Sequence, residues 1–252
     1  MAGAIFGGGY GGYFEALRPS EDRTRITPFL PSQNVGQRVS TLDRVSLSAI
    51  AHALYDNGGL PALAVNQIAM YAGPVRPQAN CGDDAINDLY EAYWAEWCKR
   101  ADFYGRPEMD FYALQTVLCQ SIDLDGDVGV LVTADAGFPQ VQVIEGWRIG
   151  LVHDGGENAQ DGVRVDTKGR VQGYVVSGQD GNPQEVAAGQ MMIARDPSPT
   201  GTYRGVCPLR RGMNDIRDAR DIQAFEKLAV KHNAALIGVI EGEPMDEGAA
   251  FN

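Results

Sequence analysis

The segment from Asp102 to Val132, DFYGRPEMDFYALQTVLCQSIDLDGDVGVLV, limits the fold most because helical periodicity gives way to a strand pattern within a few residues. A turn at 104–107 opens the segment, and Glu108 and Asp110 follow it, where the positive end of a helix dipole favours negative charge. Apolar residues then recur at steps of three and four, which predicts a helix with one apolar face: they are Phe111, Leu114, Val117, Leu118 and Ile122. Asp125-Gly126-Asp127 predicts a turn, and 128–132 predicts a buried strand.

Other helices are predicted on both sides of this segment. The first spans Thr41 to Asn57, with Ser40 or Thr41 as its cap. A second has Pro61 in its first turn and ends at Gly73-Pro74. A third runs from about Asp83 to Ala101 and carries a stripe of aromatic residues, a pattern that is typical of a core or a subunit interface. The last is a long helix, from about Pro208 to Leu236, whose polar side mixes both signs of charge.

Short strands and hairpins are predicted after the opening segment, because the apolar period changes to two. The strands fall in 141–150, 162–177 and 185–195, and a further strand begins in 237–242. Hairpin turns are expected at Thr167-Lys168-Gly169 and at 178–181. Residues 1–40, rich in glycine, aromatic residues and proline, are expected to form an irregular arm. The pattern as a whole predicts the α+β class.

Net charge restricts the partners of the chain. The 252 residues carry a formal charge of −12, with 44% hydrophobic and 21% charged residues. A protein that grips nucleic acid by neutralising phosphates carries a basic patch, so the composition argues against tight DNA binding but is compatible with a conduit past which DNA slides. The sequence shows no signal peptide and no run long enough to span a membrane, which predicts a soluble intracellular protein.

Motifs for catalysis or metal binding are incomplete in this chain. Gly7 to Gly12 lacks the GK[ST] of a phosphate loop, and 123–127 resembles a calcium loop only until Val128 and Ala134 stand where glycine and glutamate are required. Four cysteines and three histidines show no zinc spacing, which predicts free thiols. The acidic pairs have no histidine or serine motif beside them. We therefore expect no cofactor, no metal and no enzymatic activity, and the open alternative is an α+β interaction module or an enzyme of unknown activity.

Several segments, in order over nearly the whole chain, are similar to the portal proteins of lambda-type tailed bacteriophages. They are Tyr13-Phe14-Glu15-Ala16, the stretch 41–78, Trp94 and Trp97 with Cys98, 102–105, LQTVLCQSIDLDGDVGVL (114–131), VQVIEGWRIG (141–150), DTKGRVQGYVV (166–176) and Arg204-Gly205-Val206-Cys207-Pro208-Leu209. The chain departs from the family pattern at Asp127, where glutamate is usual, and near Cys207, where a proline-like break is usual. It also ends soon after the long helix, so the resemblance implies the N-terminal portion of a portal, truncated before the clip and crown are complete.

The resemblance implies four regions. Residues 1–40 correspond to a flexible arm, 41–207 to a wing-like α+β domain, 208–236 to a long stem-like helix and 237–252 to the start of a clip-like region. It also implies a structural protein of a phage or prophage head, located at a capsid vertex in the virion and in the bacterial host cytoplasm during assembly. Such a protein forms a homo-oligomeric ring, expected to be a dodecamer, that serves as a channel for DNA packaging and ejection.

The partners and site residues implied by the resemblance follow from that role. The partners are the terminase large subunit, the major capsid or scaffold protein, a head-tail adaptor, and DNA that passes without sequence specificity; no membrane is involved. The candidate residues for the DNA channel are Arg210, Arg217, Arg220 and Lys227. The candidate residues for the subunit interface are Tyr10, Tyr13, Phe14, Tyr93, Trp94 and Trp97.

Overall fold

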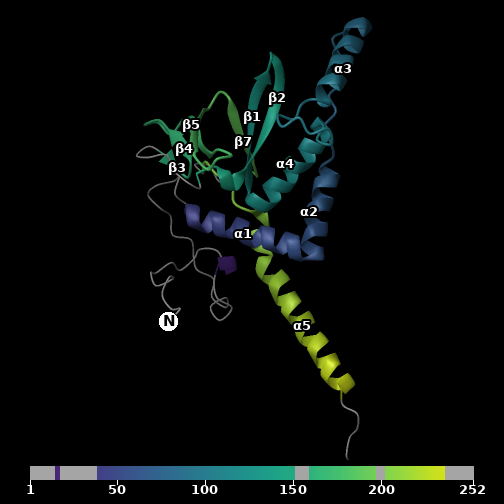
Figure 1. The fold of residues 1–252 in the computed structure, drawn as a ribbon, viewed down its shortest axis with the longest axis vertical. Helices are drawn as coiled ribbons and strands as arrows, with labels where there is room; N and C mark the ends of the chain where they lie inside the picture. The colour runs from purple at the N-terminus through teal and green to yellow at the C-terminus, as the bar shows by residue number, and fades with distance from the viewer. Residues whose placement is uncertain (1–14, 18–38, 151–158, 197–201, 236–252) are drawn as a thin grey trace, which may run out of the picture. The chain divides into compact units, whose positions relative to one another are not determined.

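The fold is described from a computed structural model, for residues 15–17, 39–150, 159–196 and 202–235. The backbone separates into two compact units, Met1–Met213 and Asn214–Asn252, which are described one at a time. The first unit combines helices with two antiparallel sheets, so the predicted α+β class is confirmed (Figure 1).

Three helices of the first unit pack against one another: α1 (Thr41–Asn57), α2 (Gly59–Ala72) and α4 (Phe111–Asp125). Side-chain caps mark the starts of α1 and α4, and a glycine marks the end of α4. The hydroxyl of Ser40 accepts a hydrogen bond from the amide of Asp43 at the start of α1, and Asp110 caps α4 in the same way through the amide of Ala113. Gly126, with a φ of 91°, ends α4 in the left-handed conformation that favours glycine. A short 3-10 helix, η1 (Glu15–Leu17), contacts α1.

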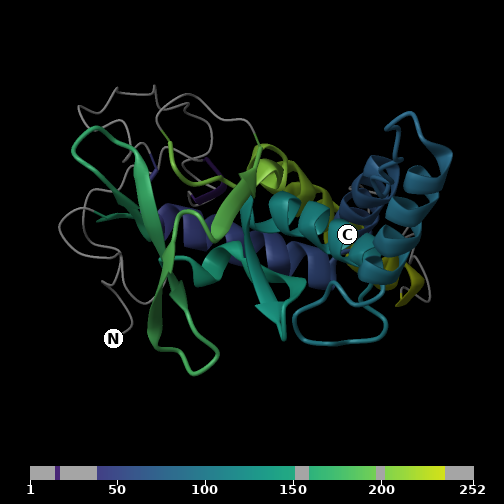
Figure 2. The ribbon, with the colours of Figure 1, turned by 90° about the horizontal axis from the view of Figure 1, so that it is seen from above.

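Helix α3 (Asp84–Cys98) is joined to the rest of the unit mainly through its C-terminal end. Asp83 caps its start by accepting from the amides of Ala85 and Ile86. Cys98 is its buried residue. The rest of the helix extends away from α1, α2 and α4 (Figures 1 and 2).

The first sheet has the strand order β2-β1-β7, with β1 (Asp127–Asp135) in the centre and β2 (Phe138–Glu145) and β7 (Met191–Arg195) at its edges. Ala136 and Gly137, both with positive φ, form the two-residue turn between β1 and β2. The second sheet has the order β3-β4-β5-β6. Its strands are β3 (Ala159–Gln160), β4 (Val163–Val165), β5 (Val171–Ser177) and β6 (Pro183–Ala187). The turns predicted at 167–169 and 178–181 are confirmed, since they join β4 to β5 and β5 to β6 as antiparallel pairs.

The two sheets share one apolar core, to which each contributes side chains. Its buried members are Ile144, Ile149, Val163, Tyr174, Val176 and Met191. Ile149 follows a 3-10 turn, η4 (Gly146–Arg148), and forms a β-bridge to Val176 of the second sheet. The turn η4 therefore links the sheets and turns its carbonyls toward α1, where the buried cluster described below forms.

The long helix α5 (Met213–Ala235) begins later than the sequence predicts. Residues Pro208–Arg211 instead form a 3-10 turn, η5, whose i to i+3 hydrogen bonds run from Arg210 to Cys207 and from Gly212 to Leu209. Gly212, with φ −113° and ψ 1°, separates this turn from α5. The prediction of one continuous helix from Pro208 is therefore wrong in its first turn. The strand predicted in 237–242 and nearly all of the arm 1–40 lie outside the described residues.

Candidate functional site

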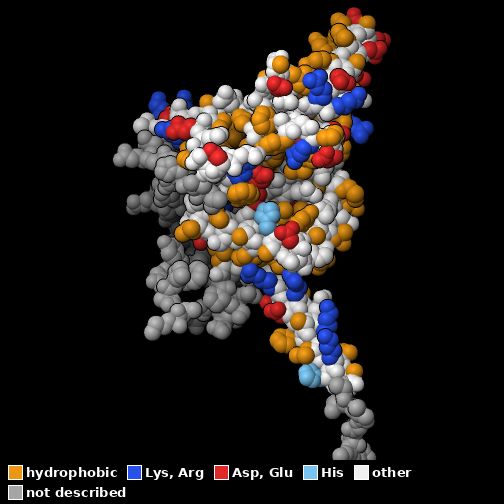
Figure 3. Space-filling view, in the orientation of Figure 1, with side chains coloured by type: hydrophobic (Ala, Val, Ile, Leu, Met, Phe, Trp, Pro, Cys, Tyr) orange, Lys and Arg blue, Asp and Glu red, His pale blue; other side chains and the backbone are white. Residues whose placement is uncertain are grey.

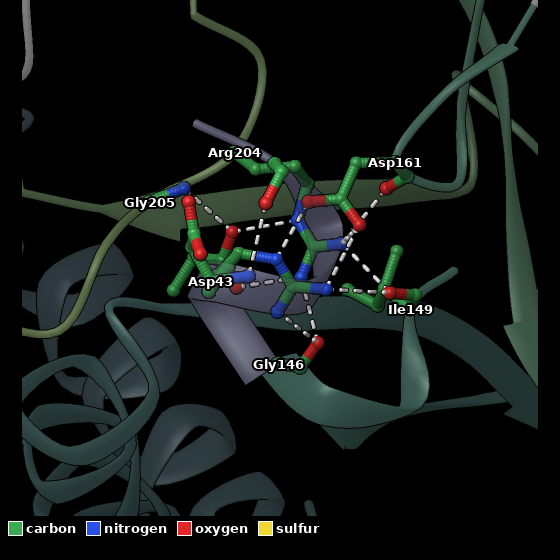
Figure 4. Close-up of polar contacts among 9 residues, drawn as sticks. Asp43, Gly146, Ile149, Asp161, Arg204 and Gly205 are labelled. Carbon is green, nitrogen blue, oxygen red and sulfur yellow. Dashed lines mark hydrogen bonds and ion pairs between the residues drawn. The ribbon is translucent and has the colours of Figure 1, made fainter. Parts of the chain in front are cut away.

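Arg204 lies in a buried polar cluster between α1, η4 and β1, with its side chain 5% exposed (Figure 4). Its Nε and Nη2 donate to the two carboxylate oxygens of Asp127 at 2.7 and 2.9 Å. Its Nη1 donates to the carbonyls of Ile149 and Asp161 at 2.7 and 2.9 Å, and Nη2 also donates to the carbonyl of Gly146 at 2.6 Å. Every nitrogen of the guanidinium therefore donates hydrogen bonds, and its bidentate pairing with the Asp127 carboxylate is one that lysine would not reproduce.

A second arginine enters the same cluster from α1. Arg44, of which 1% is exposed, donates from Nε and Nη2 to the carboxylate of Asp161 at 2.6 and 2.9 Å. It also donates to the carbonyls of Gly146 and Ile149, each at 3.3 Å, so the two guanidinium groups share both acceptors. The two positive charges are thus matched by two carboxylates, those of Asp127 and Asp161, which is how a protein accommodates buried charge.

The surroundings of Asp161 and Arg204 favour their charged forms. Burial alone would raise the pKa of Asp161, but the hydrogen bond from Arg44 and the charges of Arg204 and Arg44 outweigh it, so this pKa lies below its ordinary value. Burial alone would lower the pKa of Arg204, but the neighbouring carboxylate of Asp127 outweighs that effect and raises it. Because every charge is paired and withdrawn from solvent, the cluster offers no acid, base or nucleophile to a substrate; its role is to hold segments together.

Two glycines bring the segments of the cluster into direct backbone contact. A Cβ on Gly126 would meet the backbone of Val206, at 2.5 Å from its nitrogen, and a Cβ on Gly205 would lie 2.5 Å from the carbonyl carbon of Gly126. The amide of Gly205 donates to Asp127 at 2.7 Å, and the thiol of Cys207 donates to the carbonyl of Asp123 at 3.2 Å. The Arg204–Cys207 loop is therefore fastened onto the turn between α4 and β1.

A serine and a histidine of α1 bind the other carboxylate of that turn. The hydroxyl of Ser48 donates to Oδ1 of Asp125, and Nε2 of His52 lies 3.0 Å from the same oxygen. The hydrogen bond to Asp125 is the main cause that raises the pKa of His52. Because serine and histidine both contact the carboxylate rather than each other, the group lacks the nucleophile–base pair of a hydrolase. It joins α1 to the end of α4.

The sequence predicts the turn at Asp125-Gly126-Asp127, but it does not indicate that both carboxylates are buried. Asp125 binds side chains of α1, and Asp127 binds Arg204. Arg44 and Asp161 carried no signal at all, because an arginine in a polar helical position and an aspartate before a strand are common on surfaces. One signal was available: Asp127 begins a strand whose next residues are apolar, and an unpaired carboxylate buried there would be costly.

A cavity of about 340 Å³ lies between the two sheets. Leu131, Ile144, Val176 and Val186 line it with apolar surface. Tyr104 lies near its polar edge and accepts from Gln142 at 2.9 Å and Gln179 at 3.2 Å. Arg148 donates to the carbonyl of Ser177 and to Glu145. Tyr104 and Arg148 therefore already have polar partners at this edge of the cavity.

The predicted interface aromatics of α3 fall into two environments. Tyr93 is 59% exposed. Trp94 and Trp97 are half-buried and pack on Phe111 of α4, with ring centroids 5.3 and 4.8 Å from it. The indole of Trp97 also donates to the carbonyl of Pro139 at 2.9 Å. Tyr10, Tyr13 and Phe14 lie outside the described residues. The interface role of all six remains a prediction.

The predicted channel residues lie in two different elements, η5 and α5. Arg210 belongs to η5, and its guanidinium donates to the carbonyls of Val206 and Cys207 at 2.9 and 2.8 Å, which holds the loop beside the cluster. Arg217, Arg220 and Lys227 belong to α5, as does Lys231. Figure 3 shows Lys and Arg side chains along this helix. Their role in a channel remains a prediction.

Two helices of the first unit expose unusual amounts of apolar surface. On α3, Ile86, Leu89, Tyr90 and Tyr93 follow helical spacing and are 43–67% exposed. On α2, the buried residues Pro61, Val65 and Ala69 lie four apart, and the opposite side carries exposed Leu60, Leu63, Met70 and Tyr71. Exposed apolar area of this kind marks an interaction surface.

Two further observations concern the part of the chain that the structure describes. Within it, no group of three or more histidine, cysteine, aspartate or glutamate side chains is placed to hold a metal ion. No described helix is both long and apolar enough to cross a membrane.

The first unit thus combines an α+β fold, a buried charge cluster that ties its loops together, and exposed helical surfaces. Residues 24–251 match the family of phage portal proteins, lambda family. The chain therefore belongs to this family of structural proteins, which confirms the resemblance seen in the sequence. A search of curated proteins gave no match.

Solved structures share the fold of this chain. One is a chain of the virion of a native gene transfer agent (GTA) particle, with a TM-score of 0.51 and 16% identity, covering 79% of this chain and 46% of that chain. Another is from the neck of an empty GTA particle computed with C6 symmetry, with a TM-score of 0.53 and 17% identity, covering 79% and 48%. The chain thus spans about half the length of the solved chains that it resembles.

Proposed function

We propose that this protein is a subunit of a portal ring in a phage or phage-like particle. The ring forms a channel for DNA packaging and ejection and takes part in joining head to tail. Membership of the lambda portal family over residues 24–251 carries this proposal. The GTA chains that share the fold come from a virion and a particle neck, which supports a location in the virion.

The exposed helices support assembly from copies of this chain. A ring is built by a heterologous contact, in which one surface of a subunit meets a different surface of the next. The apolar sides of α2 and α3 and the long, exposed helix α5 are surfaces that an isolated monomer has no reason to expose. A dodecamer, with a terminase large subunit, a capsid or scaffold protein and a head-tail adaptor as its partners, is the assembly that this family membership favours.

The net charge supports a passive conduit. A formal charge of −12 is opposite in sign to that of a protein that binds DNA tightly. DNA that moves through the channel requires weak, sequence-independent contact, and no catalytic residue is needed for such passage.

The mass of the purified chain in solution, measured by light scattering, tests the proposal, with negative-stain images of the same sample. We expect closed rings with a central hole. A chain that stays monomeric from micromolar concentrations to the limit of its solubility, at both low and moderate salt, would contradict the proposed ring.

A further inference from the structure

One face of α1 carries a polar side chain at every fourth position. Arg44, Ser48 and His52 project from the same side of the helix, since residues four apart lie one above the other. The first binds the carboxylate of Asp161, and the other two bind that of Asp125. His52 is the member of this row whose charge changes near neutral pH.

Asp125 gives this histidine a buried anionic partner. Its carboxylate is 2% exposed, whereas the imidazole of His52 is 40% exposed and can exchange protons with solvent. Nε2 of the imidazole lies 3.0 Å from Oδ1 of the carboxylate. A neutral ring can donate one hydrogen bond to this oxygen, and a protonated ring adds the attraction of opposite charges. The contact therefore becomes stronger when the ring binds a proton.

The surroundings of the imidazole favour its protonated form. The hydrogen bond to Asp125 raises the pKa of His52 most, burial opposes it, and the charges of Asp125 and of Asp56, one turn further along α1, raise it further. On the other elements that pack on α1, the described charged or titratable side chains are Tyr71 of α2, Tyr112, Cys119, Asp123 and Asp125 of α4, and Arg210 and Arg211 of η5.

The turn between α4 and β1, residues 123–127, also holds the Arg204–Cys207 loop. The thiol of Cys207 donates to the carbonyl of Asp123 at 3.2 Å. A Cβ on Gly126 would lie 2.5 Å from a backbone nitrogen of the loop, so the two backbones are in direct contact. The turn therefore contacts both α1 and the loop, and a contact that fixes the turn against α1 also favours the closed loop.

We propose that His52 makes the closure of the Arg204–Cys207 loop depend on pH. With the ring protonated, the ion pair with Asp125 holds the turn between α4 and β1 against α1, and the loop packed on that turn opens less often. With the ring neutral, the ion pair is lost, a single hydrogen bond remains, and local opening becomes easier. This response goes beyond the proposed function, since it belongs to the folded chain and does not require a ring.

The rate at which iodoacetamide labels Cys207 in the whole chain measures how often the loop opens, because this thiol is buried in the closed state. Mass spectrometry of the Cys207 peptide follows the rate from about pH 5.5 to about pH 8.5, which spans the titration of histidine. Division by the rate of the free peptide at each pH removes the change in thiolate fraction. Because the folded pKa of His52 lies above the unfolded one, the added protection is fully present below about pH 6.5 and is lost as pH rises through the folded value. We expect the corrected rate to rise over that range by roughly 1.5-fold to fivefold, as for a partly exposed ion pair.

His52→Gln separates the charge of the ring from its hydrogen bond, because glutamine keeps a donor for Asp125 but does not titrate. Its corrected labelling rate should be flat across the same pH range. His232→Gln, at an exposed position of α5, is the matched control and should keep the pH response of the parent. Circular dichroism checks that both variants keep their helix content.

Three results would overturn the proposal. The first is a corrected rate for the parent that does not change with pH. The second is an equal pH response in His52→Gln and the parent, which would assign the response to another group. The third is a rate that rises steeply with urea from the lowest concentrations, because Cys207 would then react through global unfolding rather than through opening of the loop. Failure of the proposed function is seen separately, since light scattering of the parent detects rings whatever the pH response of the loop.

Discussion

Asp127 accepts two hydrogen bonds from the guanidinium of Arg204, at 2.7 and 2.9 Å, although 77 positions separate the two residues in the chain. Both belong to segments that resemble the portal family, and the pairing joins these two segments in the folded protein. The loop that contains Arg204 is held against the start of β1, and the same loop leads through η5 to the first residue of α5. The pair therefore holds the loop that leads into η5.

Replacing Arg204 with methionine should destabilise the protein by about 3–5 kcal/mol, because the carboxylate of Asp127 would remain buried without its partner. Urea unfolding followed by circular dichroism measures the change. The matched control is Lys99→Met, which breaks an exposed pair with Glu96 and should have little effect. Similar losses in the two variants would show that the cluster does not hold the fold.

Gly126→Ala should prevent folding or destabilise the protein severely. The added Cβ would meet the backbone of Val206, and the φ of 91° is unfavourable for alanine. Gly181 has a similar φ of 77° but open space around it, so Gly181→Ala should cost only about 1–2 kcal/mol. Unfolding curves of the two variants separate the effect of close contact from that of backbone conformation. Equal losses of unfolding free energy would contradict the close approach of Gly126 to the Arg204–Cys207 loop.

His52 should titrate above pH 6.5 in the folded protein, because its hydrogen bond to Asp125 favours the protonated ring. Its folded pKa exceeds its unfolded pKa, so its contribution to stability is fully present below about pH 6.5 and is lost as pH rises through the folded value. The contribution is small, since the side chain is 40% exposed. NMR titration of the ring proton measures the pKa, and Asp125→Asn should lower it; no change in that variant would exclude the contact.

The cysteines should differ widely in their reaction with iodoacetamide in the native protein. Burial raises the pKa of Cys207 to about 12, and its thiol donates to the carbonyl of Asp123, so thiolate is scarce at pH 8. Cys81 is exposed and should react first. Mass spectrometry of peptides after brief labelling gives the order. Labelling of Cys207 as fast as Cys81, without denaturant, would show that the Arg204–Cys207 loop opens readily.

Two substitutions on α3 should separate its exposed stripe from its packed end in the isolated chain. Leu89→Gln should change stability by no more than about 0.5 kcal/mol, because Leu89 is 67% exposed and both residues favour helices. Trp97→Ala should destabilise by up to about 3 kcal/mol, because it removes the packing on Phe111. Thermal unfolding compares the two. A large loss in Leu89→Gln would mean that the stripe is covered within the monomer.

Much of the local structure was determined by the sequence by itself, because capping, glycine and period depend on neighbours in the chain. The bounds of α1, the end of α4 at Gly126 and both hairpin turns of the second sheet followed from such patterns. The family was also recognisable, since the segments that carry it keep their order. The start of α5 was missed because Pro208, a residue typical of a first helical turn, begins the separate 3-10 turn η5 instead.

Only the tertiary structure decided how these elements meet. The pairing of β7 with β1, across a gap filled by the second sheet, depends on contacts between distant residues that periodicity does not encode. The cluster of Arg44, Asp127, Asp161 and Arg204 is of the same kind, because charged residues are ordinary on a surface and become informative only once burial is known. The physical reason is common to both cases: pairing and desolvation are properties of positions in space, whereas the sequence states only what each residue is able to do there.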